Sequence, residues 1–127
     1  MYTPERSSLF RAWTDPESGL TSYLLHERVA PIQQSFYFTN TAFTDDGRYL
    51  WFYCAHPPGG MAQTGRFLGV IDFEADSIHF YPETQFYDAA PCIDLSDGTA
   101  YWCTNNAVWK RAPQPHAQPA HAPQHAP

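Results

Sequence analysis

The sequence predicts an all-β protein, and three observations support this class. Aromatic residues make up 17% of the 127 residues while charged residues make up only 16%, a composition that favours strands over helices. Four runs rich in aromatic or β-branched residues follow one another between residues 36 and 81, each bounded by turn residues. A turn-and-strand pattern from this stretch also recurs in the second half of the chain.

The four runs predict one four-stranded antiparallel sheet. They occupy residues 36–43, 48–54, 66–73 and 77–81. An Asp-Asp-Gly turn joins the first two runs, a loop rich in proline and glycine joins the next two, and a short acidic turn joins the last two. Pro82 is expected to end the fourth strand, because proline cannot donate a hydrogen bond to a sheet ladder.

The residues before this sheet predict a turn and a further strand. Residues 15–19 read Asp-Pro-Glu-Ser-Gly, which is a strong turn signal, and residues 20–25 alternate as a strand does. Residues 9–13 fit either a short strand or a single helical turn. Residues 26–34 are polar and contain Pro31, so we expect a loop there.

The second half repeats the first. Asp97-Gly98 corresponds to Asp46-Gly47, and Trp102 follows it as Trp51 follows the earlier turn. We expect strands at 99–103 and 107–111, after an apolar run that is interrupted by proline. A repeat of about 40 to 50 residues containing strand, tight turn and strand is typical of a β-propeller blade.

These elements together predict an incomplete β-propeller over residues 1–111. It comprises one full four-stranded antiparallel blade, residues 36–81, most of a second, residues 88–111, and an N-terminal latch strand, residues 20–25. Propellers close with about four to eight blades, so we expect a fragment or a product truncated near residue 111, with the latch strand's partner outside the chain.

The last sixteen residues, 112–127, contain only alanine, proline, glutamine and histidine. Such a composition cannot build an apolar core, and we expect a disordered tail. His116, His121 and His125 could bind a divalent metal loosely there, but a segment without fixed geometry gives this little functional weight.

Composition also limits the function classes. The net charge is −6 and no basic stripe is present, which argues against a nucleic-acid partner. No signal peptide and no apolar run of about 18 residues is visible, so we expect no membrane partner and a cytoplasmic location. Cys54, Cys92 and Cys103 are odd in number and lack metal-site spacing, which predicts buried free thiols.

The Asp15-to-Gly19 turn with its following strand, and then Phe36-Tyr37 leading into Phe43-Thr44-Asp45-Asp46-Gly47 and Leu50-Trp51-Phe52, resemble the N-terminal part of the oligogalacturonate lyases. The resemblance covers roughly residues 12–111, and it departs from the family pattern in the five residues between Tyr37 and Phe43.

The resemblance implies a seven-bladed cytoplasmic propeller that cleaves oligogalacturonides by β-elimination in pectin degradation. In that family a manganese ion acidifies the proton at C5 and a histidine removes it. Those groups lie in later blades, so no catalytic, cofactor-binding or metal-binding residue is carried over to this chain. We expect the chain alone to be an inactive fragment, and no cofactor is assigned to it.

Several polar and aromatic residues are candidates for a site, each with a structural alternative. His26, His56 and His79 are candidate metal or substrate ligands, and Asp45, Asp46 and Asp97 are candidates for a carboxylate pair. Trp51, Trp102 and Trp109 are candidates for a sugar-stacking platform, and Arg28, Arg48 and Arg66 are candidate partners of a uronate carboxylate. The structural alternatives are favoured. In these, His26 and His56 are solvated loop residues, His79 is a sheet residue, and the aspartates cap turns. Trp51 and Trp102 belong to the core between blades, and the arginines are solvated.

Two other functions stay open. One is a non-catalytic propeller of the Tol or WD type that binds a protein or ligand, and the other is a β-sandwich that binds carbohydrate or protein. A propeller fragment leaves blade faces unburied and is expected to aggregate or behave as a molten globule, whereas a sandwich is expected to be a stable monomer.

Overall fold

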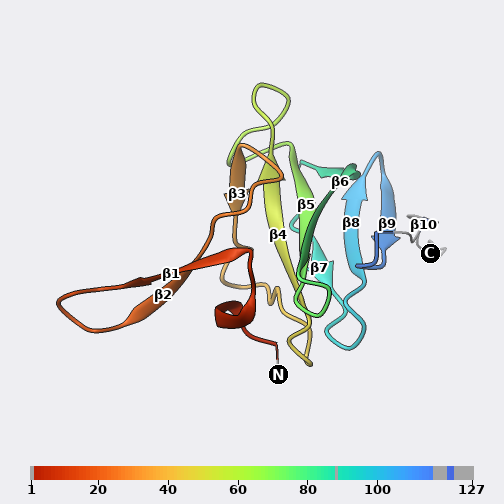
Figure 1. Ribbon diagram of the computed structural model, residues 1–127. Helices are drawn as coiled ribbons and strands as arrows, with labels where there is room; N and C mark the ends of the chain where they lie inside the picture. Colours follow the sequence, from red (N-terminus) through yellow and green to blue (C-terminus); the bar gives the residue numbers. More distant parts are fainter. Residues whose placement is uncertain (1, 88, 116–119, 122–127) are drawn as a thin grey trace.

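The computed structural model describes residues 2–87, 89–115 and 120–121, and this part of the chain is all-β (Figure 1). It contains three antiparallel sheets and one short 3-10 helix, η1 (Pro4–Arg6). The predicted fold class is therefore confirmed at the level of an all-β protein. No sheet closes on itself within the described residues.

The strands follow chain order within each sheet. The N-terminal hairpin consists of β1 (Phe10–Thr14) and β2 (Thr21–Leu25). The central sheet consists of β3 (Ile32–Gln34), β4 (Tyr49–Ala55), β5 (Arg66–Asp72) and β6 (Ser77–Phe86), and the C-terminal sheet of β7 (Cys92–Ile93), β8 (Ala100–Thr104), β9 (Ala107–Arg111) and β10 (Ala120–His121). The second, third and fourth strands predicted between residues 48 and 81 are confirmed as β4, β5 and β6.

The first strand of the central sheet was predicted wrongly. It is β3, inside the stretch expected to be a loop. Residues 36–43 instead form a loop that meets the β4 backbone at an isolated bridge between Phe43 and Leu50 and at a hydrogen bond from the Trp51 amide to the Ala42 carbonyl. The cause is Phe36, whose buried ring stacks on Tyr53 with 4.6 Å between centroids and so draws the chain out of the sheet. A tertiary contact overrides the strand preference of this aromatic run.

Pro82 does not end the fourth strand, because β6 continues to Phe86. The proline lies in an edge strand, opposite a register shift between Arg66 and Leu68 of β5, where no ladder bond requires its missing N–H. The Thr84 side chain replaces the missing backbone bond at this register shift. Its Oγ1 accepts a hydrogen bond from the Leu68 amide at 2.8 Å and donates one to the Tyr81 carbonyl at 2.6 Å.

The strand predicted at residues 20–25 is confirmed as β2, and it pairs with β1 within the chain. Its role as the latch of a propeller stays a prediction. Asp15 builds the connecting turn by accepting hydrogen bonds from the Ser18 hydroxyl and the Glu17 amide, and Gly19 takes a φ of 75°. Figure 1 shows this hairpin projecting away from the two larger sheets.

The C-terminal sheet follows the prediction in its two central strands, while its edge strand β10 lies within the tail that was expected to be disordered. β8 and β9 lie where strands were expected, and Asn105 and Asn106 join them with φ angles of 53° and 58°, as a tight hairpin turn requires.

Packing continues past Arg111. The Pro113 carbonyl accepts from the Tyr81 hydroxyl at 2.7 Å, and the Gln114 amide donates to the Tyr49 hydroxyl at 3.2 Å. The tail was predicted to be disordered, but its residues 116–119 and 122–127, including His116 and His125, lie outside the described part of the chain. His121 is described only as part of the β10 backbone.

Two apolar layers enclose the central sheet. One face packs on the C-terminal sheet, and the other packs on the N-terminal segment. The first layer contains Phe36, Tyr49, Trp51, Tyr53, Leu68, Val70, Tyr81, Phe86, Ala100 and Trp102, and the second contains Leu9, Ala30, Phe52, Cys54 and Ile71. The central sheet is therefore buried on both faces, which explains its nearly continuous apolar sequence.

Trp51 and Trp102, the matched tryptophans of the repeat, both point into the first layer. Their prediction as core residues between packed sheets is confirmed. Trp51 is fully buried, and its Nε1 donates to the Gly98 carbonyl at 2.8 Å, which ties β4 to the Asp-Gly turn of the C-terminal sheet. Equivalent faces of the two four-stranded sheets thus oppose each other.

Gly69→Ala is expected to lower the free energy of unfolding by about 1–3 kcal/mol, because overpacking of a filled core has that magnitude. A Cβ at Gly69 would lie 2.5 Å from Cζ of Phe52 and 3.0 Å from Sγ of Cys54. Urea denaturation followed by circular dichroism measures this. Gly59→Ala is the control, since its Cβ would meet only a backbone oxygen at 3.4 Å, and equal effects of the two changes would contradict the packing described.

Acid is expected to destabilise the fold through its aspartates. Burial raises the pKa of Asp72, but its hydrogen bonds from Arg48 and nearby amides outweigh this, so the pKa lies below the usual value. Hydrogen bonds from Ser7 and Ser8 lower the pKa of Asp76. Groups with lowered pKa values stabilise the folded state above the unfolded pKa of 3.8, and this contribution disappears as the pH falls through the folded values.

The measurement is urea unfolding at a series of pH values from neutral to about 2.5, a range chosen to span the aspartate pKa values. Stability should fall below pH 4, and Asp76→Asn should make that fall shallower. A stability that stays constant over the range would contradict the hydrogen-bonded aspartates.

Candidate functional site

Two hollows flank the end of β3 and share Gln34 and Ser35. The first, here called the Arg66 groove, has a volume of about 660 Å³, and the second, the hairpin cavity, has about 270 Å³. The Arg66 groove is lined by Gln34, Ser35, Phe36, Tyr37, Phe38, Tyr53, Arg66 and Ala90. It lies at the end of the central sheet where β3, β4 and β5 meet the loop after β3.

Arg66 begins β5 and supplies the positive charge of the groove. Its guanidinium carbon lies 4.3 Å from the ring centroid of Tyr53 and 5.3 Å from that of Phe86, so it is held by cation–π contacts. No carboxylate in the described residues pairs with it, and its buried Nε has no hydrogen-bond partner there. Arg66 is therefore a fixed cation without a counter-charge from the described chain.

Aromatic side chains form the rim of the groove. Tyr37 is 62% exposed and Phe38 is 85% exposed, and their rings lie 4.5 Å apart at an angle of 50°. Asn40 holds their loop, because its amide N–H bonds the Tyr37 carbonyl at 2.9 Å and its side chain donates to the Pro91 carbonyl at 3.2 Å. The two rings are thereby presented to solvent by a hydrogen-bonded turn.

The polar groups of the groove suit recognition of an anion. The buried Oε1 of Gln34 has no partner in the described residues and can accept a hydrogen bond. Burial raises the pKa of Tyr53, and the nearby positive charge of Arg66 opposes this shift only partly. The Tyr53 phenol thus stays neutral at physiological pH and does not cancel the charge of Arg66.

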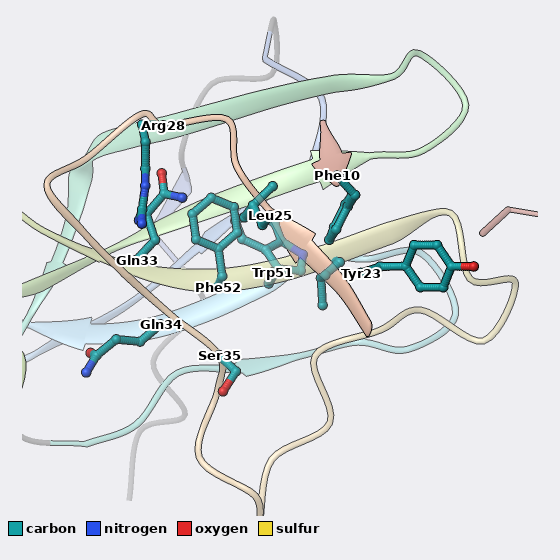
Figure 2. A pocket seen from close by; sticks show the side chains of 10 residues that line it. Phe10, Tyr23, Leu25, Arg28, Gln33, Gln34, Ser35, Trp51 and Phe52 are labelled. Atoms are coloured by element: carbon teal, nitrogen blue, oxygen red, sulfur yellow. The ribbon is translucent and has the colours of Figure 1, made fainter. Parts of the chain in front are cut away.

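The hairpin cavity lies between the base of the N-terminal hairpin and the central sheet (Figure 2). Gln33 fixes the loop at its mouth: Oε1 accepts from the Val29 amide at 2.8 Å, and Nε2 donates to the Glu27 carbonyl at 3.0 Å. Arg28 lies on this loop, beside Gln33, and has no ion pair in the described residues.

The predicted histidines do not come together. His26 is exposed, with Nε2 3.1 Å from the Ser8 carbonyl, as expected of a loop histidine. His56 is not solvated: it is half-buried with ring centroids of Phe67 and Phe80 at 5.9 and 4.6 Å. His79 is half-buried in β6, as predicted. No group of three His, Cys, Asp or Glu residues that could hold a metal occurs in the described part of the chain.

The predicted turn caps are confirmed for two aspartates. Asp46 accepts from the Thr44 hydroxyl and the Arg48 amide, and Asp97 accepts from the Thr99 amide. Asp45 contributes its backbone amide, which donates to the Leu95 carbonyl at 2.8 Å. The aspartates thus have structural roles, and Trp109 packs partly buried against the layer between the sheets.

Arg28 is exposed, as expected, whereas other arginines and two cysteines depart from expectation. Arg48 is not simply solvated, because it forms a bidentate pair with Asp72 at 3.0 Å and a contact with Glu74 at 2.7 Å. Cys54 is buried, as predicted, and burial raises the pKa of its thiol to about 12. The other two cysteines, Cys92 and Cys103, are exposed, so their predicted burial is wrong.

Comparison with known proteins identifies no family for the chain. No family model, curated protein or solved structure matches it. The resemblance to the oligogalacturonate lyases therefore stays a prediction. Among the residues described, none belongs to a helix long and apolar enough to span a membrane.

Arg66 is among the arginines that the sequence offers as uronate partners, but the groove around it is not predicted from the sequence. Tyr37 and Phe38 were assigned to a strand, and Gln34 to a loop without a role. The run of three aromatic residues at 36–38 does not reveal the groove, because a similar run at 51–53 is buried in a strand covered on both faces.

Proposed function

We propose that this chain binds a carboxylated oligosaccharide, of the oligogalacturonide class, in the Arg66 groove. One observation carries the proposal: an arginine without an acidic partner in the described chain lies over the Tyr53 ring and lines a groove with exposed aromatic rings. A positively charged, planar donor beside apolar rings is suited to a ligand that combines a carboxylate with an apolar ring face.

Each wall of the groove has a role in this proposal. The edge of the Arg66 guanidinium donates hydrogen bonds to a uronate carboxylate, while its face stays on Tyr53. The rings of Tyr37 and Phe38 cover the C–H face of a neighbouring sugar, and the Gln34 side chain lines the groove beside them. The volume of about 660 Å³ lies within the range of small-molecule sites.

We propose that binding by this chain occurs without cleavage. The resemblance assigns the base and the manganese ligands to later blades, and in this chain Arg66 and Gln34 supply binding groups only. A cytoplasmic location and a role in pectin degradation belong to the same resemblance and stand as predictions.

For the fold, we propose a β-sandwich-like unit of the two four-stranded sheets. Trp51 and Trp102 occupy equivalent positions and point into one shared layer. In a ring of blades, equivalent faces all point the same way around the ring, so opposed faces favour the sandwich over two successive propeller blades. The propeller remains the alternative.

The test is isothermal titration calorimetry of the chain with trigalacturonate and with a neutral galactose trisaccharide. We expect saturable binding of the uronate and binding at least about ten-fold weaker for the neutral sugar, since hydrogen bonds to charged groups contribute roughly 1.5–3 kcal/mol. Equal affinities would overturn the role of the carboxylate. The ultraviolet absorbance of the mixture, which would rise on β-elimination, should stay constant.

A further inference from the structure

We propose that the hairpin cavity is a separate site for a small carboxylic acid with an aromatic or branched apolar body. The site does not depend on the Arg66 groove, although the two hollows share Gln34 and Ser35 at their common wall.

The walls of the cavity define an apolar body for the ligand. Side chains from the hairpin base and from the central sheet face one another there. The lining residues are Phe10, Tyr23, Leu25, Arg28, Gln33, Gln34, Ser35, Leu50, Trp51 and Phe52. A dry apolar cavity of about 150 Å³ is enough for benzene, so about 270 Å³ accommodates one ring with a short side chain.

The charge at the mouth defines the head group. Arg28 is the one charged residue among those that line the cavity, and within the described chain it pairs with no carboxylate. Figure 2 shows its guanidinium beside Gln33, on the opposite side of the cavity from Phe10 and Tyr23. The amide of Gln33 is already bonded to Val29 and Glu27, so Arg28 is the group left to meet a ligand's anion.

Hydrogen bonds hold the walls of the cavity apart. Gln33 holds the loop of residues 27–29 against β3, and the hairpin base above it is fixed by backbone bonds of His26 and Glu27 to the Leu9 carbonyl. The loop therefore cannot simply collapse onto Phe52 to fill the space. A single cation beside the apolar side chains of Phe10, Leu25 and Phe52 favours a ligand with one carboxylate and an apolar body.

The experiment is a titration of the full chain with 3-phenylpropionate, followed by two-dimensional ¹H–¹⁵N spectra. We expect saturable shifts at the amides of Leu25, Arg28 and Leu50. Arg28→Gln should weaken binding at least about ten-fold, the loss that removing a charge-assisted hydrogen bond gives, but should leave the weaker binding of neutral 3-phenylpropanol unchanged. Arg11→Gln is the matched control, because Arg11 is exposed on the same hairpin and does not line the cavity.

Three outcomes would overturn the proposal. They are the absence of saturable shifts, equal binding by wild type and Arg28→Gln, and loss of binding in Arg66→Gln, which would place the probe in the other hollow. A failure of trigalacturonate to bind would leave this result untouched, since that ligand tests the Arg66 groove.

Discussion

Arg66→Gln is expected to weaken binding of trigalacturonate at least about ten-fold, and up to about 150-fold, while the fold is kept. The range corresponds to the roughly 1.5–3 kcal/mol of a hydrogen bond to a charged group. Glutamine retains length and a donor but removes the charge and the stacking of the guanidinium on Tyr53. Since Arg66 pairs with no acidic residue in the described chain, the change leaves no carboxylate there without its partner.

Calorimetry at low and physiological salt measures the effect, and circular dichroism verifies the fold. Arg66→Lys should recover only part of the affinity, because lysine has the charge without the planar pair of donors. Arg6→Gln, at an exposed arginine in η1, is the control and should bind as the wild type does. Wild-type affinity in Arg66→Gln would place the ligand elsewhere.

Trp51→Ala is expected to lower the free energy of unfolding by about 3–5 kcal/mol, the usual effect of truncating a large buried aromatic side chain. Trp51 is fully buried in the layer between the two four-stranded sheets, with its ring centroid 6.0 Å from that of Tyr81. Its removal also leaves the Gly98 carbonyl without the indole donor at 2.8 Å. The change therefore weakens the contact on which the association of the two sheets depends.

Trp51→Phe separates the contribution of ring burial from that of the hydrogen bond, since it keeps an aromatic ring and loses the donor. We expect it to lower the free energy of unfolding by about 1–3 kcal/mol, because the Gly98 carbonyl is left unsatisfied and the ring is smaller. Trp13→Ala is the matched control, because Trp13 is 52% exposed on the projecting hairpin. Urea unfolding monitored by far-ultraviolet circular dichroism gives all three values. A Trp51→Ala variant as stable as Trp13→Ala would contradict the shared layer.

The sequence was sufficient to predict strands where local signals agreed. β4, β5 and β9 combine strand-forming residues with preceding turns that contain Gly47, Gly65 and Asn105-Asn106 respectively, so propensity and turn chemistry indicate the same structure. The first strand of the central sheet failed because Phe36 is drawn to Tyr53, and β6 passed Pro82 because an edge position tolerates proline. Both outcomes depend on contacts between residues distant in the chain.

The site was less accessible to prediction than the fold. Arg66 was one of three candidate arginines, and nothing local distinguishes it from Arg48, which pairs with Asp72 24 residues away. The difference arises from register: Arg48 lies next to Tyr49, which pairs with Asp72 at the end of β5, whereas Arg66 faces aromatic rings. The exposure of Tyr37 and Phe38 likewise follows from the loop that Phe36 starts.

The most direct test of the central claim is to map trigalacturonate onto the chain by two-dimensional ¹H–¹⁵N spectra. We expect saturable shifts concentrated at Gln34, Tyr37, Phe38 and Arg66, with residues 100–104 of the C-terminal sheet unchanged. Shifts confined to other surfaces, or no saturable shift, would contradict the assignment of the Arg66 groove as a uronate-binding site.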